Sequence, residues 1–346
     1  MKDSATITDN KTGVLIINLG TPDSPSVPDV RRYLRQFLLD ERVIDIPELN
    51  RQLLINLVIV PFRGPKSAKV YKELWDERGS PLKYYGEDLT ALIKESLGEN
   101  FMVELAMRYQ NPSIESALEK MKKAGLKKII VLPLFPQYAS ASTGSVQQEV
   151  MRLVSKWLII PDISFISSFW DKPLFIQAFT EIGRRYMNER NYDHILFTYH
   201  GLPERQLTKA DEHNVCSFGT CCNNLDAKNQ YCYRAQCYAT TRLLADSLGL
   251  KPEQYTVSFQ SRLGKTPWIK PYTDEVIDEL AKKGYKSVLA FSPSFVADCL
   301  ETTVEIGREY RELFEAKGGK HWQLVESLNV NTTWVEAVES MIREQV

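Results

Sequence analysis

The sequence predicts an α/β protein built from two similar lobes, each a four-stranded parallel sheet flanked by helices. Its apolar runs of Val, Ile, Leu and Phe are nearly continuous, as in parallel strands that are covered on both faces. Amphipathic segments lie between these runs and supply the crossover connections. The same succession of elements occurs twice along the chain. Together these observations indicate a pair of doubly wound, Rossmann-like lobes.

Each half of the chain contains four expected strands. They span 14–20, 102–109, 128–138 and 163–169 in the first half, and 194–201, 255–262, 287–295 and 322–328 in the second. The segments 113–125 and 272–284 have the apolar spacing of crossover helices. Each of them ends in a glycine, which suits a helix C-terminus.

The two halves match each other in layout. The segments 107–140 and 259–298 both run from a strand through a proline-containing turn, a helix and a second strand to a proline-containing exit. Likewise, VLIINLGTPDSP parallels ILFTYHGLPERQ. We therefore expect an N-terminal lobe over 1–170 and a C-terminal lobe over 171–330. Such a duplication places a ligand cleft between the lobes, where the carboxyl ends of the strands meet.

Composition excludes several classes of protein. The chain has 346 residues, a net charge of −1 and an estimated pI of about 6.5, so no basic field attracts nucleic acid. The first residues, MKDSATITDNKTG, lack the apolar region of a secretory signal. No segment approaches the roughly 18 consecutive apolar residues of a membrane span. These features favour a cytoplasmic protein without nucleic-acid partners.

The longest apolar run is LLINLVIVPF, at 53–62. We favour a buried strand for this run. The alternative is an exposed apolar lip that touches a membrane or an apolar ligand.

Five of the six cysteines lie within 216–237. Reducing conditions in the cytoplasm disfavour disulfides, so such a group is more often metal-binding or catalytic. Its spacing differs from the paired C-x2-C motifs of zinc ribbons. Thiolates in a loop rich in Asn, Gly, Ser and Gln suit an iron–sulfur cluster. Unligated surface thiols are the alternative.

Candidate catalytic residues stand at two strand ends, whereas the common dinucleotide, nucleotide and hydrolase motifs are absent from the sequence. His200 ends a strand in FTYHGLPER. Asp298, Glu301 and Glu305 are spaced i, i+3 and i+7, so a helix starting near Asp298 would carry them on one face. An imidazole facing carboxylates across a cleft can transfer protons and handle a cation. The alternatives are a structural histidine and a solvated helix face.

Aromatic and cationic residues near the other strand ends could form the walls of the cleft. They suit a large, flat, apolar ligand with acidic substituents, although most such side chains are simply core. Arg63, Tyr71, Trp75 and Ser80 follow the apolar run, Arg108 and Tyr109 end a strand, and Trp170 and Trp268 lie at turns.

The motifs described so far, taken in order, resemble those of the ferrochelatase family. The matching segments are INLGTPDSP, GSPL, MRYQNPSIESAL, LPLFPQYASASTGSV, TYHGLPER, FQSRLGKTPWIKPYTDE and FVADCLETTVEI. The resemblance implies the chelatase fold around a porphyrin cleft, with a C-terminal helix over 331–346 that packs back on the body. It also implies insertion of Fe²⁺ into protoporphyrin IX to form protohaem, the terminal step of haem biosynthesis.

The resemblance assigns site residues by position. His200 matches the active-site histidine, Glu301 the glutamate opposite it, and Asp298 the acid that precedes this glutamate. His200 and Glu301 are jointly implied to take up pyrrole protons and guide iron. Cys299 departs from the family pattern, because many relatives have histidine there, and this places a metal-relay role at that position in doubt.

The resemblance also assigns residues that bind the porphyrin. Arg63, Tyr71 and Ser80 resemble positions that hold the propionates. Arg108 and Tyr109 match an active-site Arg–Tyr pair. The implied partners are the porphyrin, the haem product, a membrane touched at its periphery by the apolar lip, and an upstream porphyrin-synthesis enzyme.

The stretch 214–231 is an addition to the plain family pattern. Some bacterial ferrochelatases resemble this chain in carrying internal cysteines that bind a [2Fe-2S] cluster, so four of the five cysteines are implied as its ligands. Cys216 and Cys232 belong to the expected set. We expect one of the adjacent pair Cys221 and Cys222, together with Cys237, to complete it. Coproporphyrin III ferrochelatase, cobalt chelatase and a non-catalytic haem- or iron-binding redox sensor are the alternative functions.

Overall fold

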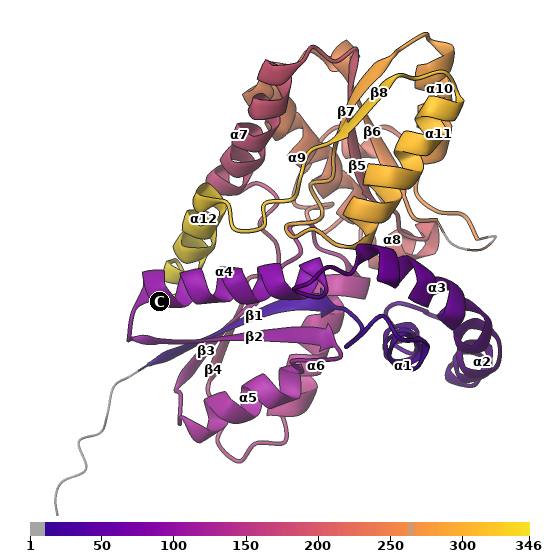
Figure 1. Cartoon of the computed structure of the whole chain (residues 1–346). Helices are drawn as coiled ribbons and strands as arrows, with labels where there is room; N and C mark the ends of the chain where they lie inside the picture. Colours follow the sequence, from indigo (N-terminus) through magenta and orange to yellow (C-terminus); the bar gives the residue numbers. More distant parts are fainter. Residues whose placement is uncertain (1–10, 263, 265) are drawn as a thin grey trace, which may run out of the picture.

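The computed structural model describes residues 11–262, 264 and 266–346, and most of the polar N-terminal segment considered above lies outside them. Two four-stranded parallel sheets form the framework, with strand orders β2-β1-β3-β4 and β6-β5-β7-β8 (Figure 1). The first sheet contains β1 (Thr12–Gly20), β2 (Phe101–Tyr109), β3 (Lys128–Pro133) and β4 (Asp162–Phe165). The second contains β5 (His194–His200), β6 (Tyr255–Gln260), β7 (Ser287–Phe291) and β8 (His321–Leu324). The predicted fold class and all eight predicted strands are confirmed.

Several strands end earlier than the sequence predicts. β3 ends at Pro133 and β7 at Phe291, two residues before Pro293. Proline has no N–H to donate to a neighbouring strand, so the apolar run continues there as an extended exit loop rather than as sheet. These exit loops carry residues towards the region between the lobes.

The duplicated layout is also confirmed. The central strand of each sheet pairs in parallel with the next two strands of its own half, β1 with β2 and β3, and β5 with β6 and β7. The exits of β2 and β6 fold back in the same way, because Met107 N–H donates to the Pro112 carbonyl and Phe259 N–H to the Pro271 carbonyl.

Helices cover both faces of each sheet (Figure 1). On the first sheet, α4 (Pro81–Leu97) lies opposite α5 (Ile114–Lys123) and α6 (Ser145–Val154). On the second, α7 (Pro173–Glu189) and α9 (Tyr233–Leu248) lie opposite α10 (Thr273–Lys282) and α11 (Tyr310–Ala316). The crossover helix α5 shows why the sequence folds this way. Ser113 caps its N-terminus, apolar residues recur along one face, and Gly125 adopts a positive φ after its end.

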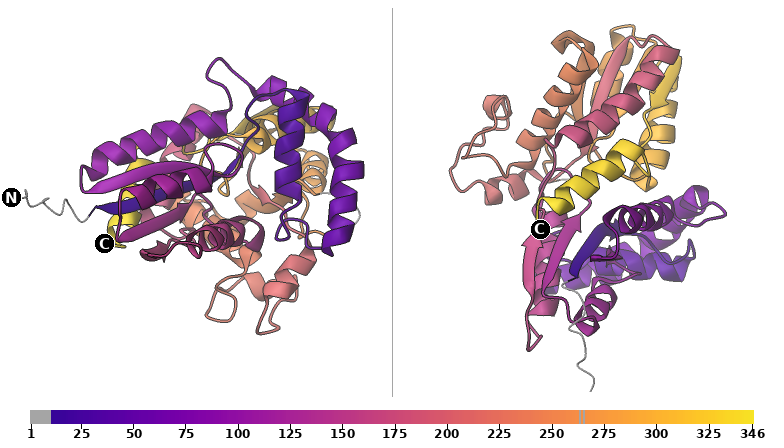
Figure 2. Two further views of the ribbon diagram at one scale, coloured as in Figure 1. Left: turned by 90° about the horizontal axis from the view of Figure 1, so that it is seen from below. Right: turned by 90° about the vertical axis from the view of Figure 1, so that its left-hand side faces the viewer.

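One hydrophobic core joins the two lobes. It combines residues of β1 and β2 with residues of α4, α7, α9 and the second sheet. The C-terminal helix α12 (Thr332–Arg343) packs against both α4 and α7, and its Trp334 is fully buried against Phe169 and Phe175. The C-terminus thus lies between the lobes (Figure 2). This shared core fixes one lobe relative to the other.

The segment 53–62 is helical, so the favoured prediction of a buried strand is wrong. It continues α2 (Glu48–Leu53) through a π-helical segment, η1 (Leu54–Ile59), into α3 (Val60–Leu74). With α1 (Val27–Leu38), these helices stand beside the sheets (Figure 1). We call the exposed apolar side chains of α2, η1 and the start of α3 the lip; they are Leu49, Leu53, Leu54, Leu57, Val58 and Phe62. In the part of the chain that the structure describes, no helix is both long and apolar enough to cross a bilayer.

Candidate active site

His200 is the last residue of β5. The strand residues before it are buried, whereas the imidazole is partly exposed at the carboxyl end of the sheet. Its Nδ1 lies 2.7 Å from the Gly201 carbonyl oxygen. A carbonyl only accepts hydrogen bonds, so Nδ1 carries a proton, and whenever the ring is neutral Nε2 has the lone pair. The backbone therefore holds His200 in a tautomer whose Nε2 can accept a proton or bind a metal ion.

Glu301 and Glu305 lie one turn apart on η5 (Glu301–Glu309), a π-helical segment that leads into α11. Glu305 accepts hydrogen bonds from Ser261 Oγ at 2.5 Å and from Tyr310 Oη at 3.0 Å. Burial raises the pKa of Glu305, and the charge of Glu301 raises it further, whereas Ser261 and the charge of His200 oppose the rise. His200 and Glu301 thus both lie within electrostatic reach of Glu305.

Asp298 precedes this helix and faces another loop. Its carboxylate accepts hydrogen bonds from the Ser327 N–H at 3.1 Å, from Asn329 Nδ2 at 2.8 Å and from Thr302 Oγ1 at 3.3 Å. Both oxygens are therefore used in joining the exits of β7 and β8. Asp298 does not continue the stripe that Glu301 and Glu305 form.

The lip helices pack against the η5 segment. Tyr33 of α1 and Tyr71 of α3 are buried and in edge-to-face contact, with ring centroids 6.1 Å apart, in a core that includes Val304. Burial raises the pKa of both tyrosines, and the charge of Glu301 adds to each rise. Sequence reasoning missed Tyr33, although the apolar period of α1 could have placed it on the inward face.

Two other predicted residues lie at the start of α4 and on α3. Ser80 precedes α4, is buried, and lies 2.9 Å by its Oγ from Thr21 Oγ1, just after β1. Arg63 is exposed on α3, next to Phe62 of the lip. Cys299 is buried beside Glu301, and burial raises the pKa of its thiol, so it remains neutral.

Arg108 and Tyr109 belong to a closed polar group at the end of β2. Arg108 donates to Asp40 at 2.7 Å and to Ser145 Oγ at 2.7 Å, while the Tyr109 hydroxyl donates to Asp40 at 2.9 Å. Tyr109 has no exposed surface. Sequence reasoning missed Asp40, because an acidic residue just after a helix normally indicates a solvated turn.

Four of the five clustered cysteines lie close together. The sulfurs of Cys221 and Cys222 are 4.0 Å apart, Cys216 interacts with Cys221, and a hydrogen bond joins the thiols of Cys222 and Cys232. That hydrogen bond lowers the pKa of Cys232 and raises that of Cys222. The 3₁₀ turn η3 (Thr220–Cys222) brings the sulfurs of both adjacent cysteines together, which the sequence did not lead us to expect.

Cys237 lies apart from this group, on the second turn of α9. It is fully buried in the shared core, and burial raises the pKa of its thiol. Its thiol contacts the Tyr233 hydroxyl. Cys237 is thus placed as a core residue.

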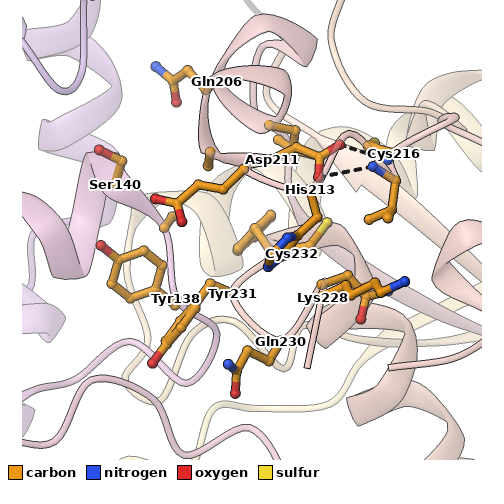
Figure 3. A pocket seen from close by; sticks show the side chains of 18 of the residues that line it. Tyr138, Ser140, Gln206, Asp211, His213, Cys216, Lys228, Gln230, Tyr231 and Cys232 are labelled. Atoms are coloured by element: carbon orange, nitrogen blue, oxygen red, sulfur yellow. Dashed lines mark hydrogen bonds between the residues drawn. The ribbon is translucent and has the colours of Figure 1, made fainter. Parts of the chain in front are cut away.

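A cavity of about 520 Å³ adjoins the cysteine segment (Figure 3). Cys216 and Cys232 line one side, and Tyr138 and Ser140, from the exit of β3, line the other. Neither His200 nor Glu301 reaches it. Among residues 11–262, 264 and 266–346, no group of three or more His, Cys, Asp or Glu side chains has the geometry to hold a metal ion.

The paired sheets define the class of protein. Over 96% of this chain and 95% of the other, the fold is similar to "SirB from Bacillus subtilis with Fe3+", with a TM-score of 0.54 and 14% identity. It is also similar to CbiX, described as the terminal enzyme for biosynthesis of sirohaem in denitrifying bacteria, over 96% of this chain and 99% of that one, with a TM-score of 0.50 and 9% identity. These likenesses establish the chelatase fold.

Sequence comparison identifies the family within this class. The family model described as Ferrochelatase matches residues 11–346. The ferrochelatase of Coxiella burnetii (strain Dugway 5J108-111) is 46% identical over 338 residues, covering 97% of this chain and 94% of that protein. The ferrochelatase of Legionella pneumophila (strain Paris) is 46% identical over 336 residues, covering 97% and 100%. The chain belongs to the ferrochelatase family.

Proposed function

We propose that this ferrochelatase is a lyase that inserts Fe²⁺ into protoporphyrin IX and forms protohaem, the terminal step of haem biosynthesis. Family membership supports Fe²⁺ and a porphyrin as substrates and haem as the product. The observation that carries the site assignment is the hydrogen bond at Nδ1 of His200, which leaves Nε2 for chemistry at a strand end within electrostatic reach of Glu305.

Metal insertion requires groups that accept the pyrrole protons and groups that guide the cation. Imidazole and carboxylate suit Fe²⁺, and both can accept protons. We assign these tasks jointly to His200 and Glu301. The raised pKa of Glu305 equips it to hold a proton that leaves the site. Asp298 then supports the reaction indirectly, because it fastens the loop before η5.

The lip and its neighbours would bind the macrocycle. Arg63, exposed beside the lip, offers a guanidinium to a propionate, and we assign Tyr71 and Ser80, which are both buried, to the same porphyrin site. We retain Arg108 and Tyr109 as porphyrin-site residues that act through the polar group with Asp40. A free-base porphyrin is flat and admits metal slowly. Binding energy from these contacts can bend it and expose the pyrrole nitrogens.

We further propose that Cys216, Cys221, Cys222 and Cys232 ligate a [2Fe-2S] cluster. The donor chemistry fits, since the sulfurs of Cys221 and Cys222 are 4.0 Å apart, Arg234 donates to Cys222 Sγ at 3.0 Å, and the Ser217 N–H donates to Cys221 Sγ at 3.4 Å. Such donors stabilise thiolate charge. Cluster binding requires the sulfurs to turn towards a common centre. When bound, the cluster would supply one-electron redox chemistry.

The lip supports a proposal about location. Its side chains form an apolar edge beside the porphyrin wall, and an edge of this kind can dip into the surface of a membrane. We propose a cytoplasmic protein that touches the membrane there and receives its apolar substrate from an upstream porphyrin-synthesis enzyme.

An anaerobic assay with Fe²⁺ tests the proposed function. Protoporphyrin IX and coproporphyrin III are supplied side by side, and haem formation is followed by absorbance. We expect faster insertion into protoporphyrin IX. Preference for coproporphyrin III would transfer the assignment to that substrate, and no insertion into either porphyrin would favour a non-catalytic sensor.

A further inference from the structure

Tyr233 makes a direct contact with the backbone of His200. It is the first residue of α9 and is buried, with 7% of its surface exposed. Its hydroxyl donates a hydrogen bond to the His200 carbonyl oxygen at 2.8 Å. The N–H of the same peptide unit, that of Gly201, donates to the Gln260 carbonyl at 2.8 Å. The peptide between His200 and Gly201 is therefore held from both sides.

This peptide determines where the next carbonyl points. The acceptor of the His200 Nδ1 proton is the carbonyl of Gly201, directly after the clamped peptide. If the peptide rotates, Gly201 turns with it and the acceptor moves away from Nδ1. The imidazole would then populate both neutral tautomers. The Tyr233 hydroxyl thus influences which nitrogen of His200 carries the proton, because it holds the peptide that orients the Gly201 carbonyl.

The neighbours of Tyr233 in the chain are tied to the cysteine segment. Cys232, immediately before it, interacts with Cys222. Arg234, immediately after it, is also buried; it donates to Cys222 Sγ at 3.0 Å and to the Lys270 carbonyl at 3.2 and 3.1 Å. A displacement of Cys222 therefore pulls on both sides of Tyr233.

We propose that Tyr233 is a positioning residue for His200, and that through it the start of α9 couples the state of the cysteine segment to the active site. A buried tyrosine hydroxyl needs some hydrogen-bond acceptor, and many backbone carbonyls could serve. Here the acceptor is the peptide that fixes the tautomer of His200. The coupling to catalysis rests on the proposed function, whereas the effect on the tautomer does not.

The Tyr233→Phe variant tests the positioning role in two ways. We expect kcat for Fe²⁺ insertion to fall about three- to tenfold, the effect of one lost hydrogen bond, with KM for the porphyrin unchanged. We also expect ¹⁵N NMR of histidine-labelled protein to show His200 changing from the Nδ1-protonated tautomer to a mixture. The chain has only four histidines, so the signals can be assigned by substitution.

Tyr199→Phe is the matched control. Tyr199 is also fully buried, precedes His200 in β5, and bonds by its hydroxyl to Thr241 at 2.8 Å. Its loss should leave kcat and the His200 tautomer unchanged. An unchanged tautomer in Tyr233→Phe, or the same shift in Tyr199→Phe, would overturn the inference. If the wild type inserts no iron, the proposed function fails while the NMR result still decides the role of Tyr233.

A double-mutant cycle with Cys222→Ser tests the coupling. Cys222→Ser should lower kcat in the wild-type background and shift the His200 tautomer. It should add little to either effect in the Tyr233→Phe background, because the hydrogen bond from Tyr233 to His200 is already absent there. Independent, multiplying effects of the two substitutions would contradict the coupling.

Discussion

The carboxylate of Asp40 lies 2.7 Å from the guanidinium of Arg108, with only 4% and 15% of the two side chains exposed. Asp40 follows α1 and Arg108 lies near the end of β2, so this ion pair fastens the lip helices to the first sheet. The same carboxylate accepts hydrogen bonds from Tyr109 and Ser145. Asp40 is therefore the centre of a buried polar group that joins α1, β2 and α6.

Replacing Asp40 by alanine should destabilise the protein strongly. The substitution leaves the buried Arg108 charge without its partner, which typically costs about 3–5 kcal/mol. Urea unfolding measures the change. Glu149→Ala is the control, because its partner Arg152 is half exposed and such surface pairs contribute about 1 kcal/mol or less. Equal small changes in both variants would show that the Asp40 group does not anchor the lip.

Serine substitutions should identify the cluster ligands. Purified protein should be coloured and contain about two iron atoms per chain beyond any bound haem. Single replacement of Cys216, Cys221, Cys222 or Cys232 should abolish the cluster absorption, because each sulfur belongs to the neighbouring set. Cys237→Ser should retain it, since Cys237 is a core residue. Colourless, zinc-loaded wild type, or loss of the absorption only in Cys237→Ser, would contradict the assignment.

His194 should make stability depend on pH. Burial, with a smaller effect of Lys283, lowers its pKa from 6.5 to about 4. Below pH 6.5 His194 becomes protonated in the unfolded chain, whereas in the folded chain it stays neutral until about pH 4. The free energy of unfolding therefore falls as the pH is lowered across this window. The full effect is at most about 3 kcal/mol. Urea unfolding at several pH values should show a smaller acid loss in His194→Gln; identical curves would refute this role.

The lip should control membrane binding. Leu57 and Phe62 are 65% and 73% exposed, so replacing both by glutamate removes apolar contact area without opening the core. Flotation with anionic vesicles should show weaker binding, while the Tm stays close to that of the wild type. Leu158→Glu is the control, because Leu158 is fully exposed but lies between α6 and β4, outside the lip. Equal losses in both variants would mean that the lip has no special part.

The strands could be predicted because covered parallel strands have a distinctive, continuous apolar composition. The same criterion failed at 53–62, since a short apolar run fits a helix as well as a strand, and its exposure depends on which other elements cover it. Sequence identified His200 and Glu301 as strand-end and helix residues. It could not identify Asp40 or Tyr233, whose roles come from contacts between segments far apart in the chain. The close approach of Cys221 and Cys222 depends on a local turn that their spacing does not specify.

Iron insertion by His200→Ala and Glu301→Gln tests the central claim most directly. Each variant is given Fe²⁺ and protoporphyrin IX anaerobically, and porphyrin binding is followed separately by fluorescence. Because each substitution removes a group that we propose to take protons or guide iron, we expect insertion to fall by about 100-fold or more while the porphyrin still binds. Near-normal turnover in both variants would show that the chemistry does not lie between this imidazole and this carboxylate.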